Sequence, residues 1–419
     1  FSACKPRPIT QTPMPISTNT TTSSSSTPSQ PEINFLEGLL SKYPQYFSDI
    51  LRNRDAYRVQ IIYTQIDRKA NNSPIFTNYT FNVDPSKYFY PASTVKMPVA
   101  LLALEEIKKL KDKGVTRNSS MITEAAYSKQ TPVYNDPTTP DGRPTVEQYI
   151  KKIFLVSDND AFNRLYEFVG QEQINKRLQD LGYTNAAILH RLEISMTEDE
   201  NRHTNPVKFY NDSTRLLYEQ PMRVSNWVYP QRNDSLGRGY YSSGQLIQHA
   251  MDFSKKNRIT LPELHQILQT ILFPKEFRSK ERFEIDDEDY RFVRKYMQMY
   301  PAEAGFPPYD TSEYHDAYGK LLYWGSEKGA LPKNLRIFSK EGDAYGFLTD
   351  VAYIVDFDKN IEFMVSATIY CNSDGILNDN NYDYETIGLP FMKNLGRVLY
   401  DFELTRERKR VPDLTEFKF

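Results

Sequence analysis

The segment PASTVKMPVALLALEEI, residues 91–107, places two reactive side chains at the start of an apolar helix. Ser93 and Lys96 are three residues apart, so a helix puts both on one face. The apolar residues that follow predict a helix that ends near Gly114, and Pro98 falls early enough in it to be tolerated. A neutral lysine amine can remove the proton of a neighbouring serine hydroxyl and make it nucleophilic. Taken alone, the pattern equally describes a helix N-cap and a surface lysine.

A second polar motif, Ser157-Asp158-Asn159, lies between two predicted helices. The first helix begins at the capping box Thr145-Val146-Glu147-Gln148 and continues with apolar residues at helical spacing. The second is predicted over residues 161–169. A loop between two packed helices holds its side chains rigidly, as a catalytic group requires. The alternative is a simple turn, which the same composition would suit.

A third motif, Lys340-Glu341-Gly342, follows a predicted strand near the C-terminus. Residues 335–339, 346–356 and 361–370 alternate in polarity and predict three successive strands. Lys340 would end the first strand, and Gly342 would let the backbone approach a ligand closely. A Gly-Asp turn with an incidental lysine is the alternative.

The order of elements predicts an α/β (α+β) fold. A helix near Asn34 and strands over 57–65 and 75–82 come first, helices occupy the middle, and three strands and a helix over 385–402 end the chain. Such an order implies one antiparallel sheet built from both chain ends and flanked by helices, with an all-helical lobe between.

The predicted domains follow from this arrangement. Residues 1–32 are a disordered tether, 33–405 a catalytic domain and 406–419 a C-terminal tail. Within the catalytic domain, 33–92 and 335–405 form the α/β lobe. Residues 93–334 form the helical lobe, in which the stretch from about 206 to 335 is an insertion of unknown role.

In their order and flanking sequences, the three motifs resemble the S-x-x-K, S-D-N and K-T-G set of class A β-lactamases and penicillin-binding proteins. The resemblance extends loosely over residues 34–405. It implies that Ser93 is acylated and that Lys96 activates it. It also implies that Ser157 relays a proton to the leaving nitrogen and that Asn159 holds a substrate amide.

The same resemblance assigns the third motif to substrate binding. Lys340 and Gly342 would contact the substrate, and the backbone N–H groups of Ser93 and Asp343 would form the oxyanion hole. Glu341 departs from the family pattern, which has threonine or serine there. A carboxylate facing the cleft would repel the carboxylate of a β-lactam.

The second departure from the family pattern concerns the base that activates the deacylating water. Arg191-Leu192-Glu193 resembles the start of the family's omega loop, but the expected Glu-x-x-x-Asn pattern does not follow. Glu193, Glu198 and Glu200 are all candidates, and we select Glu198.

These features predict a serine hydrolase that forms an acyl-enzyme on Ser93, with β-lactam hydrolysis as the activity that the resemblance implies. The partner would be a small-molecule β-lactam or a peptide or ester substrate. One alternative is a D-peptidase or esterase of the same fold without efficient β-lactam turnover. Another is a non-catalytic module that binds cell-surface polymers, against which the intact motif residues argue. The oligomeric state stays open.

Composition excludes other classes of function. The chain has 52 basic and 54 acidic residues and no basic stripe, which argues against nucleic acid. Its five histidines show no ligand spacing, so we expect no metal site, and no organic cofactor is implied.

Cys4 predicts a lipid anchor. Phe1-Ser2-Ala3-Cys4 resembles the end of a bacterial lipoprotein signal, and residues 5–31 are rich in Pro, Ser and Thr, as in a tether. We therefore expect lipidation at Cys4 and a location in the bacterial cell envelope, either periplasmic or tethered to the outer membrane. The lipid would be the chain's only link to a membrane.

Overall fold

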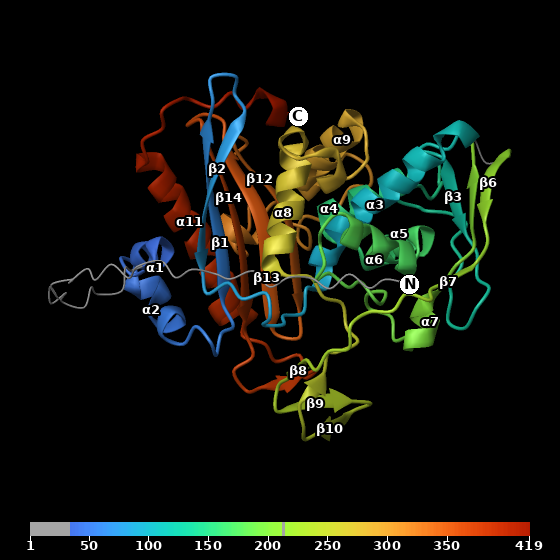
Figure 1. Cartoon of the computed structure of the whole chain (residues 1–419), viewed down its shortest axis with the longest axis horizontal. Coiled ribbons are helices and arrows are strands. Elements are labelled where there is room, and N and C mark those ends of the chain that lie inside the picture. Colours follow the sequence, from blue (N-terminus) through green and yellow to red (C-terminus); the bar gives the residue numbers. More distant parts are fainter. Residues whose placement is uncertain (1–33, 212–213) are drawn as a thin grey trace, which may run out of the picture. The chain divides into compact units, whose positions relative to one another are not determined.

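A five-stranded antiparallel sheet forms the centre of the computed structural model, which describes residues 34–211 and 214–419 (Figure 1). Its strands are β1 (Gln60–Arg68), β2 (Pro74–Phe81), β12 (Leu335–Ala344), β13 (Phe347–Asp356) and β14 (Ile361–Tyr370). They lie in the order β12-β13-β14-β1-β2. Because β1 pairs with β14, the sheet is built from both ends of the chain, which confirms the predicted fold class.

The two faces of the sheet bury two separate apolar cores. Alternate residues of a strand point to opposite faces, so Ile62 packs in one core and its neighbours Ile61 and Tyr63 in the other. Two groups of helices cover these faces (Figure 1). The first is α8 (Leu261–Leu272) with α9 (Asp287–Gln298); the second is α1 (Phe35–Leu40), α2 (Pro44–Arg52) and α11 (Leu389–Thr405).

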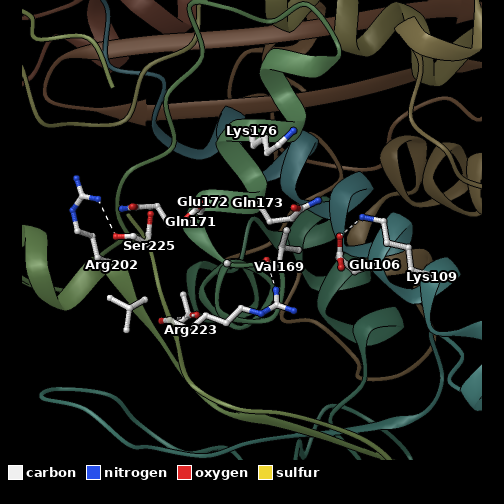
Figure 2. A pocket seen from close by; sticks show the side chains of 13 residues that line it. Glu106, Lys109, Val169, Gln171, Glu172, Gln173, Lys176, Arg202, Arg223 and Ser225 are labelled. Carbon is white, nitrogen blue, oxygen red and sulfur yellow. Dashed lines mark hydrogen bonds and ion pairs between the residues drawn. The ribbon is translucent and has the colours of Figure 1, made fainter. Parts of the chain in front are cut away.

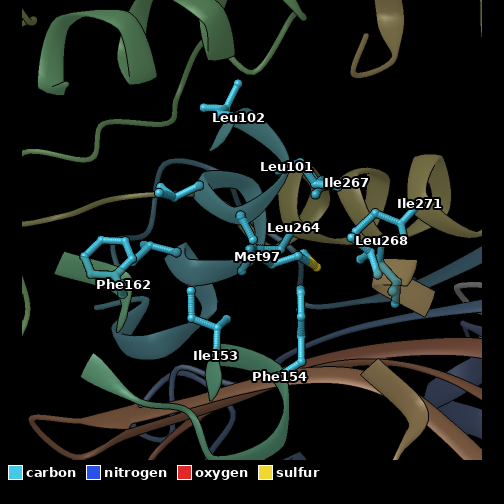
Figure 3. Packing of buried hydrophobic residues seen from close by; sticks show 14 of the residues in the cluster. Met97, Leu101, Leu102, Ile153, Phe154, Phe162, Leu264, Ile267, Leu268 and Ile271 are labelled. Carbon is cyan, nitrogen blue, oxygen red and sulfur yellow. The ribbon is translucent and has the colours of Figure 1, made fainter. Parts of the chain in front are cut away.

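Four helices that follow Ser93 in the chain pack against one another. They are α3 (Lys96–Lys109), α4 (Val146–Val156), α5 (Asn159–Val169) and α6 (Gln171–Asp180). Figure 3 shows Met97 and Leu101 of α3 facing Leu264 and Ile267 of α8, with Phe154 of α4 below Met97 in this view. These side chains belong to the larger core, so α3 is packed from the helical side and from the sheet side at once.

The second lobe is not all-helical, contrary to the prediction. Strands β3 (Ser120–Thr123), β5 (Val207–Tyr210) and β6 (Leu216–Gln220) form a three-stranded sheet within it. In β5 the side chains alternate between buried and partly exposed, a period of two that is too short to stand out in the sequence. The predicted insertion contains further short strands, among them β8 (Ser235–Leu236), β9 (Gly239–Ser242), β10 (Gln245–Ile247) and β11 (Met251–Asp252).

The end of the chain belongs to the core. Residues 406–419 were predicted as a tail, but Leu414 and Phe417 are buried there. The ring of Phe417 lies 5.0 Å from that of Tyr353 and 5.6 Å from that of Phe273, centroid to centroid. These last residues therefore close the space between the sheet and α8, and Phe35–Phe419 form one compact unit.

Two other predictions concern the strand that carries Lys340 and the N-terminal residues. Lys340 does not end its strand, because β12 continues to Ala344 and the whole third motif is strand. Cys4 and the tether at 1–32 lie outside the described residues and stay predictions. Within the described part of the chain, no helix is both long and apolar enough to cross a membrane.

Candidate active site

Ser93 lies in a tight turn at the start of a buried helix. Residues Ala92–Val95 form a 3-10 turn that leads directly into α3, and the Ser93 side chain is partly exposed. Ala92 has a φ of 45°, in the left-handed region that non-glycine residues rarely adopt. Because α3 is packed on both sides, the position of Ser93 is set by the core rather than by a loop.

Lys96 is completely buried, and its amine is bound to the second motif. Its Nζ donates hydrogen bonds to the backbone oxygen of Ser157 and, at 3.3 Å, to Ser157 Oγ. Burial, and then the nearby charge of Lys340, lower the pKa of Lys96 to about 7. The amine is therefore neutral in a large fraction of molecules at pH 7, which a proton acceptor requires.

The second motif is positioned by two helix ends. Ser157 ends α4 with a φ of 53°, and the Asp158 side chain accepts a hydrogen bond from the backbone N–H of Ala161 at 2.7 Å. Asp158 is thus the N-cap of α5, and this contact fixes the loop. The helix starts at Asn159, two residues earlier than predicted.

Lys340 reaches the same serine from the sheet. Its Nζ donates to Ser157 Oγ at 2.8 Å, to the Glu341 backbone oxygen at 3.1 Å and to Glu341 Oε1 at 2.9 Å. Lys96, Ser157 and Lys340 therefore form one continuous polar cluster. Such a serine, held between two amines, is well placed to transfer a proton.

The side chain of Glu341 leaves the backbone on the opposite face of the sheet from that of Lys340. It pairs across the strands with Asp350, on the same face as Ile337, which packs in the core beneath α11. Its carboxylate nevertheless reaches Lys340 Nζ around the edge of β12, the outermost strand. Burial by itself raises the pKa of Glu341, but the charge and hydrogen bond of Lys340 outweigh it and lower that pKa to about 2.

Gly342 brings β12 against the backbone that carries Ser93. A Cβ atom at this position would lie 2.7 Å from both the Pro91 oxygen and the Ser93 nitrogen. Only glycine fits such a contact. The Glu341 carbonyl oxygen faces the free edge of β12, where it accepts from Lys340, so the N–H of Asp343, two residues on, points to the same edge.

A cavity of about 320 Å³ opens beside these groups. Its walls include Ser93, Asn159, Glu193 and Asp343. The remaining wall residues are Tyr90, Ala92, Leu192, Ala344, Tyr345, Asn378, Asn380 and Tyr382. Three of the predicted site residues therefore border one space, whereas Lys96 and Lys340 do not line it.

Comparison with protein families matches residues 45–222 to the β-lactamase enzyme family. This segment is similar to the β-lactamase enzyme family. The match includes Ser93, Lys96, Ser157 and Asn159 and ends before the third motif at Lys340.

No curated protein sequence matches the chain. Among solved structures, it is similar to a β-lactamase from Burkholderia vietnamiensis, with 13% identity and a TM-score of 0.48 over 89% of this chain and 98% of that one. For one from Xanthomonas campestris pv. campestris the identity is 14% and the TM-score 0.47, over 88% and 99%. A class A β-lactamase from Clostridium kluyveri gives 14% and 0.44, over 85% and 98%. Similarities this distant indicate no particular activity.

Within the matched segment, the structure brings Glu193 rather than Glu198 to the cavity. Glu193 lines the wall near Ser93 and has a φ of 57°, a strained backbone for a glutamate. Glu198 is held elsewhere, 2.9 Å from Lys255 and hydrogen-bonded by Tyr229 at 2.7 Å. The hydrogen bonds of Lys255 and Tyr229 lower the pKa of Glu198 to about 2. The selection of Glu198 is thus not supported by its position.

Sequence reasoning missed the wall formed by residues 378–382. This wall is held by part of the insertion, because β15 (Ile376–Leu377) pairs in parallel with β9 and Asn378 Nδ2 donates to the Tyr241 oxygen at 3.2 Å. Asn378 and Asn380 both have a φ of 60°. The run Asn-Asp-Asn-Asn predicts a turn, but its composition does not indicate that the turn lies at the cavity.

Two buried ionisable residues near Glu341 were also missed. Burial lowers the pKa of Lys320 to about 8, and its Nζ donates to the Met297 oxygen at 2.6 Å. Burial raises the pKa of Asp350 to about 7. Asp350 alternates with apolar residues on β13, which is a visible sign that it is buried.

Another cavity of the same molecule, of about 470 Å³, contains none of the motif residues. Figure 2 shows its walls, where Lys109 is paired with Glu106 and Arg223 donates to the Val169 oxygen. Its basic groups are thus already partnered. The described residues also contain no group of His, Cys, Asp and Glu that would hold a metal ion.

Proposed function

We propose that the protein is a serine hydrolase that forms an acyl-enzyme on Ser93. The observation that carries this proposal is the convergence of Lys96 and Lys340 on Ser157 Oγ, beside the glycine that presses β12 against the backbone of Ser93. Among the described residues, the Ser93 hydroxyl has no hydrogen-bond partner. It is free to contact a substrate, and catalytic hydrogen bonds often tighten only when substrate is bound.

In the proposed acylation, neutral Lys96 accepts the Ser93 hydroxyl proton as Ser93 Oγ attacks the substrate carbonyl. The N–H groups of Ser93 and Asp343 bind the resulting oxyanion. Ser157, hydrogen-bonded to both lysines, passes a proton to the leaving group, and the bond between the acyl carbon and that group breaks. Asn159 on the cavity wall holds a substrate amide.

In the proposed deacylation, Glu193 takes a proton from a water molecule, and that water attacks the acyl-enzyme carbonyl. The bond to Ser93 Oγ then breaks, the proton that Glu193 removed from the water passes to Ser93 Oγ, and the acid is released. Glu193 is favoured over Glu198 and Glu200 because it alone of the three lines the cavity at Ser93.

The bond that is cleaved distinguishes two versions of the proposal. β-Lactam hydrolysis is the activity that the name of the matched family suggests. A D-peptidase or esterase is the second candidate, and the ion pair between Lys340 and Glu341 favours it because that lysine already binds a carboxylate.

The test is to incubate the protein with a fluorophosphonate and, separately, with a labelled penicillin, and to follow the protein mass over time. We expect a fluorophosphonate adduct on Ser93 that is absent from Ser93→Ala. For the penicillin, a transient adduct means turnover, a lasting one means a trapped acyl-enzyme, and none favours the second candidate. Equal labelling of Ser93→Ala would refute the nucleophile. No labelling by either reagent would favour a non-catalytic binding module.

A further inference from the structure

The ammonium group of Lys340 already has an anionic partner inside the protein. Its Nζ lies 2.9 Å from Glu341 Oε1, and both side chains are buried. If an anionic substrate drew Lys340 away, Glu341 would remain buried without a counter-charge, which is strongly unfavourable. Lys340 is therefore not a vacant anion-binding group.

The cavity at Ser93 has negative groups on its walls and no positive ones. Glu193 and Asp343 both line it, and both side chains are exposed. None of the described residues that line it is a lysine, arginine or histidine. The remaining polar walls are tyrosines and asparagines, and the faces of tyrosine rings attract cations.

A neighbouring cavity of about 220 Å³ extends this charge along the edge of β12. It shares Asp343 with the first cavity and adds Glu385, and it is also lined by Glu341, whose charge Lys340 balances. His315 is its one residue that could carry a positive charge, and burial together with Lys328 lowers the pKa of His315, so it is neutral at pH 7. The two cavities thus present carboxylates on both sides of Asp343.

We infer that the site accepts substrates whose acyl part is uncharged or positively charged, and prefers cationic to anionic ones. The inference rests on the proposed function, because it names a substrate class for acyl transfer to Ser93. A negative charge in the cavity would meet Glu193 and Asp343 while Lys340 is held by Glu341. A positive charge would be attracted by the same two carboxylates at short range. Penicillins, which carry a carboxylate, are poor substrates on this reasoning.

The test uses three 4-nitrophenyl esters whose acyl chains have equal length and end in trimethylammonium, carboxamide or carboxylate. Ser93 Oγ bonds to the acyl carbon, the ester C–O bond breaks and 4-nitrophenolate leaves; water then hydrolyses the acyl-enzyme. We expect kcat/KM to fall in the order cationic, neutral, anionic, with at least tenfold between the first and the last. An anionic ester that is hydrolysed as well as the neutral one would overturn the inference.

Glu341→Gln tests the part played by the ion pair. It frees the charge of Lys340, so the ratio of kcat/KM for the anionic ester to that for the neutral ester should rise at least tenfold. Glu407→Gln makes the same change of net charge at an exposed position and should leave the ratio as it is. An unchanged ratio in a folded Glu341→Gln protein would overturn the role of the ion pair. The comparison of the three esters with the wild-type protein tests the inference even if this variant fails to fold.

Fluorophosphonate labelling of the same wild-type samples separates the two hypotheses. Labelled Ser93 without the expected charge preference overturns this inference and leaves the proposed function in place. No labelling and no ester hydrolysis overturn both.

Discussion

Lys96 should control the pH dependence of Ser93 acylation. Because the pKa of Lys96 is lowered to about 7, the neutral amine is lost as the pH falls below that value. With an uncharged fluorophosphonate, we expect the labelling rate to fall about tenfold per pH unit below pH 7 and to level off about one unit above it. The reagent carries no charge, so its binding adds no pH dependence of its own.

Replacing Lys340 should move this midpoint upward. The two amines contact the same Ser157 Oγ, at 3.3 Å from Lys96 and 2.8 Å from Lys340. Their nitrogens are therefore at most about 6 Å apart, and two such charges repel by about 3 kcal/mol at an effective dielectric near 20, or about two pKa units. In Lys340→Met the buried Glu341 loses its counter-charge and takes up a proton, so its attraction for Lys96 is lost as well. We therefore expect the midpoint to rise by about one pH unit rather than two.

The assay is the labelling rate, measured by intact-protein mass between pH 5 and pH 9 for the wild type, Lys340→Met and Lys96→Met. Lys96→Met should lose acylation by several orders of magnitude, because it removes a member of the catalytic unit. A flat profile in the wild type, or a midpoint that moves down in Lys340→Met, would refute the reasoning.

Three other changes test particular contacts. Glu193→Gln should slow deacylation by about 10²–10⁴-fold and leave a lasting ester adduct in mass spectra, whereas Glu198→Gln should not; equal turnover in both would exclude Glu193 as the base. Gly342→Ala should slow Ser93 labelling more than about tenfold, because its Cβ would lie 2.7 Å from the Ser93 nitrogen; an unchanged rate would contradict that contact. Phe417→Ala should lower the free energy of unfolding by about 3–5 kcal/mol in urea titrations, and a change below about 1 kcal/mol would mean that the C-terminus is dispensable.

The sequence predicted the sheet well because its strands carry strong local signals. Residues 346–356 and 361–370 became β13 and β14 with nearly the predicted limits. The short strands of the insertion were missed because two to five residues carry too little periodicity to be recognised. Phe417 could not be placed from sequence, since its burial depends on Tyr353 and Phe273, which are remote in the chain.

The site was predictable where one short motif holds the chemistry. Ser93, Lys96 and Ser157 were found in this way, and the structure places them around one polar cluster or beside it. Glu193 and Glu198 are only five residues apart, and composition does not tell them apart. The backbone turn at Leu192 and Glu193 decides which glutamate faces the cavity. This turn is held by α5, because Asn163 donates a hydrogen bond to the Leu192 oxygen and accepts one from the Leu192 N–H.

The pairing of β1 with β14 has a consequence for how the protein is made. About 300 residues separate these neighbouring strands, and their register joins Gln60 to Thr368. During synthesis from the N-terminus, β1 and β2 emerge long before their partner exists. Until β14 is made, the edge of β1 that pairs with it has no hydrogen-bond partner. The strand that carries Lys340 joins the sheet only after almost the whole chain has left the ribosome. Folding should therefore be slow and dependent on chaperones, and no truncated chain that lacks residues 335–370 should ever become an active enzyme.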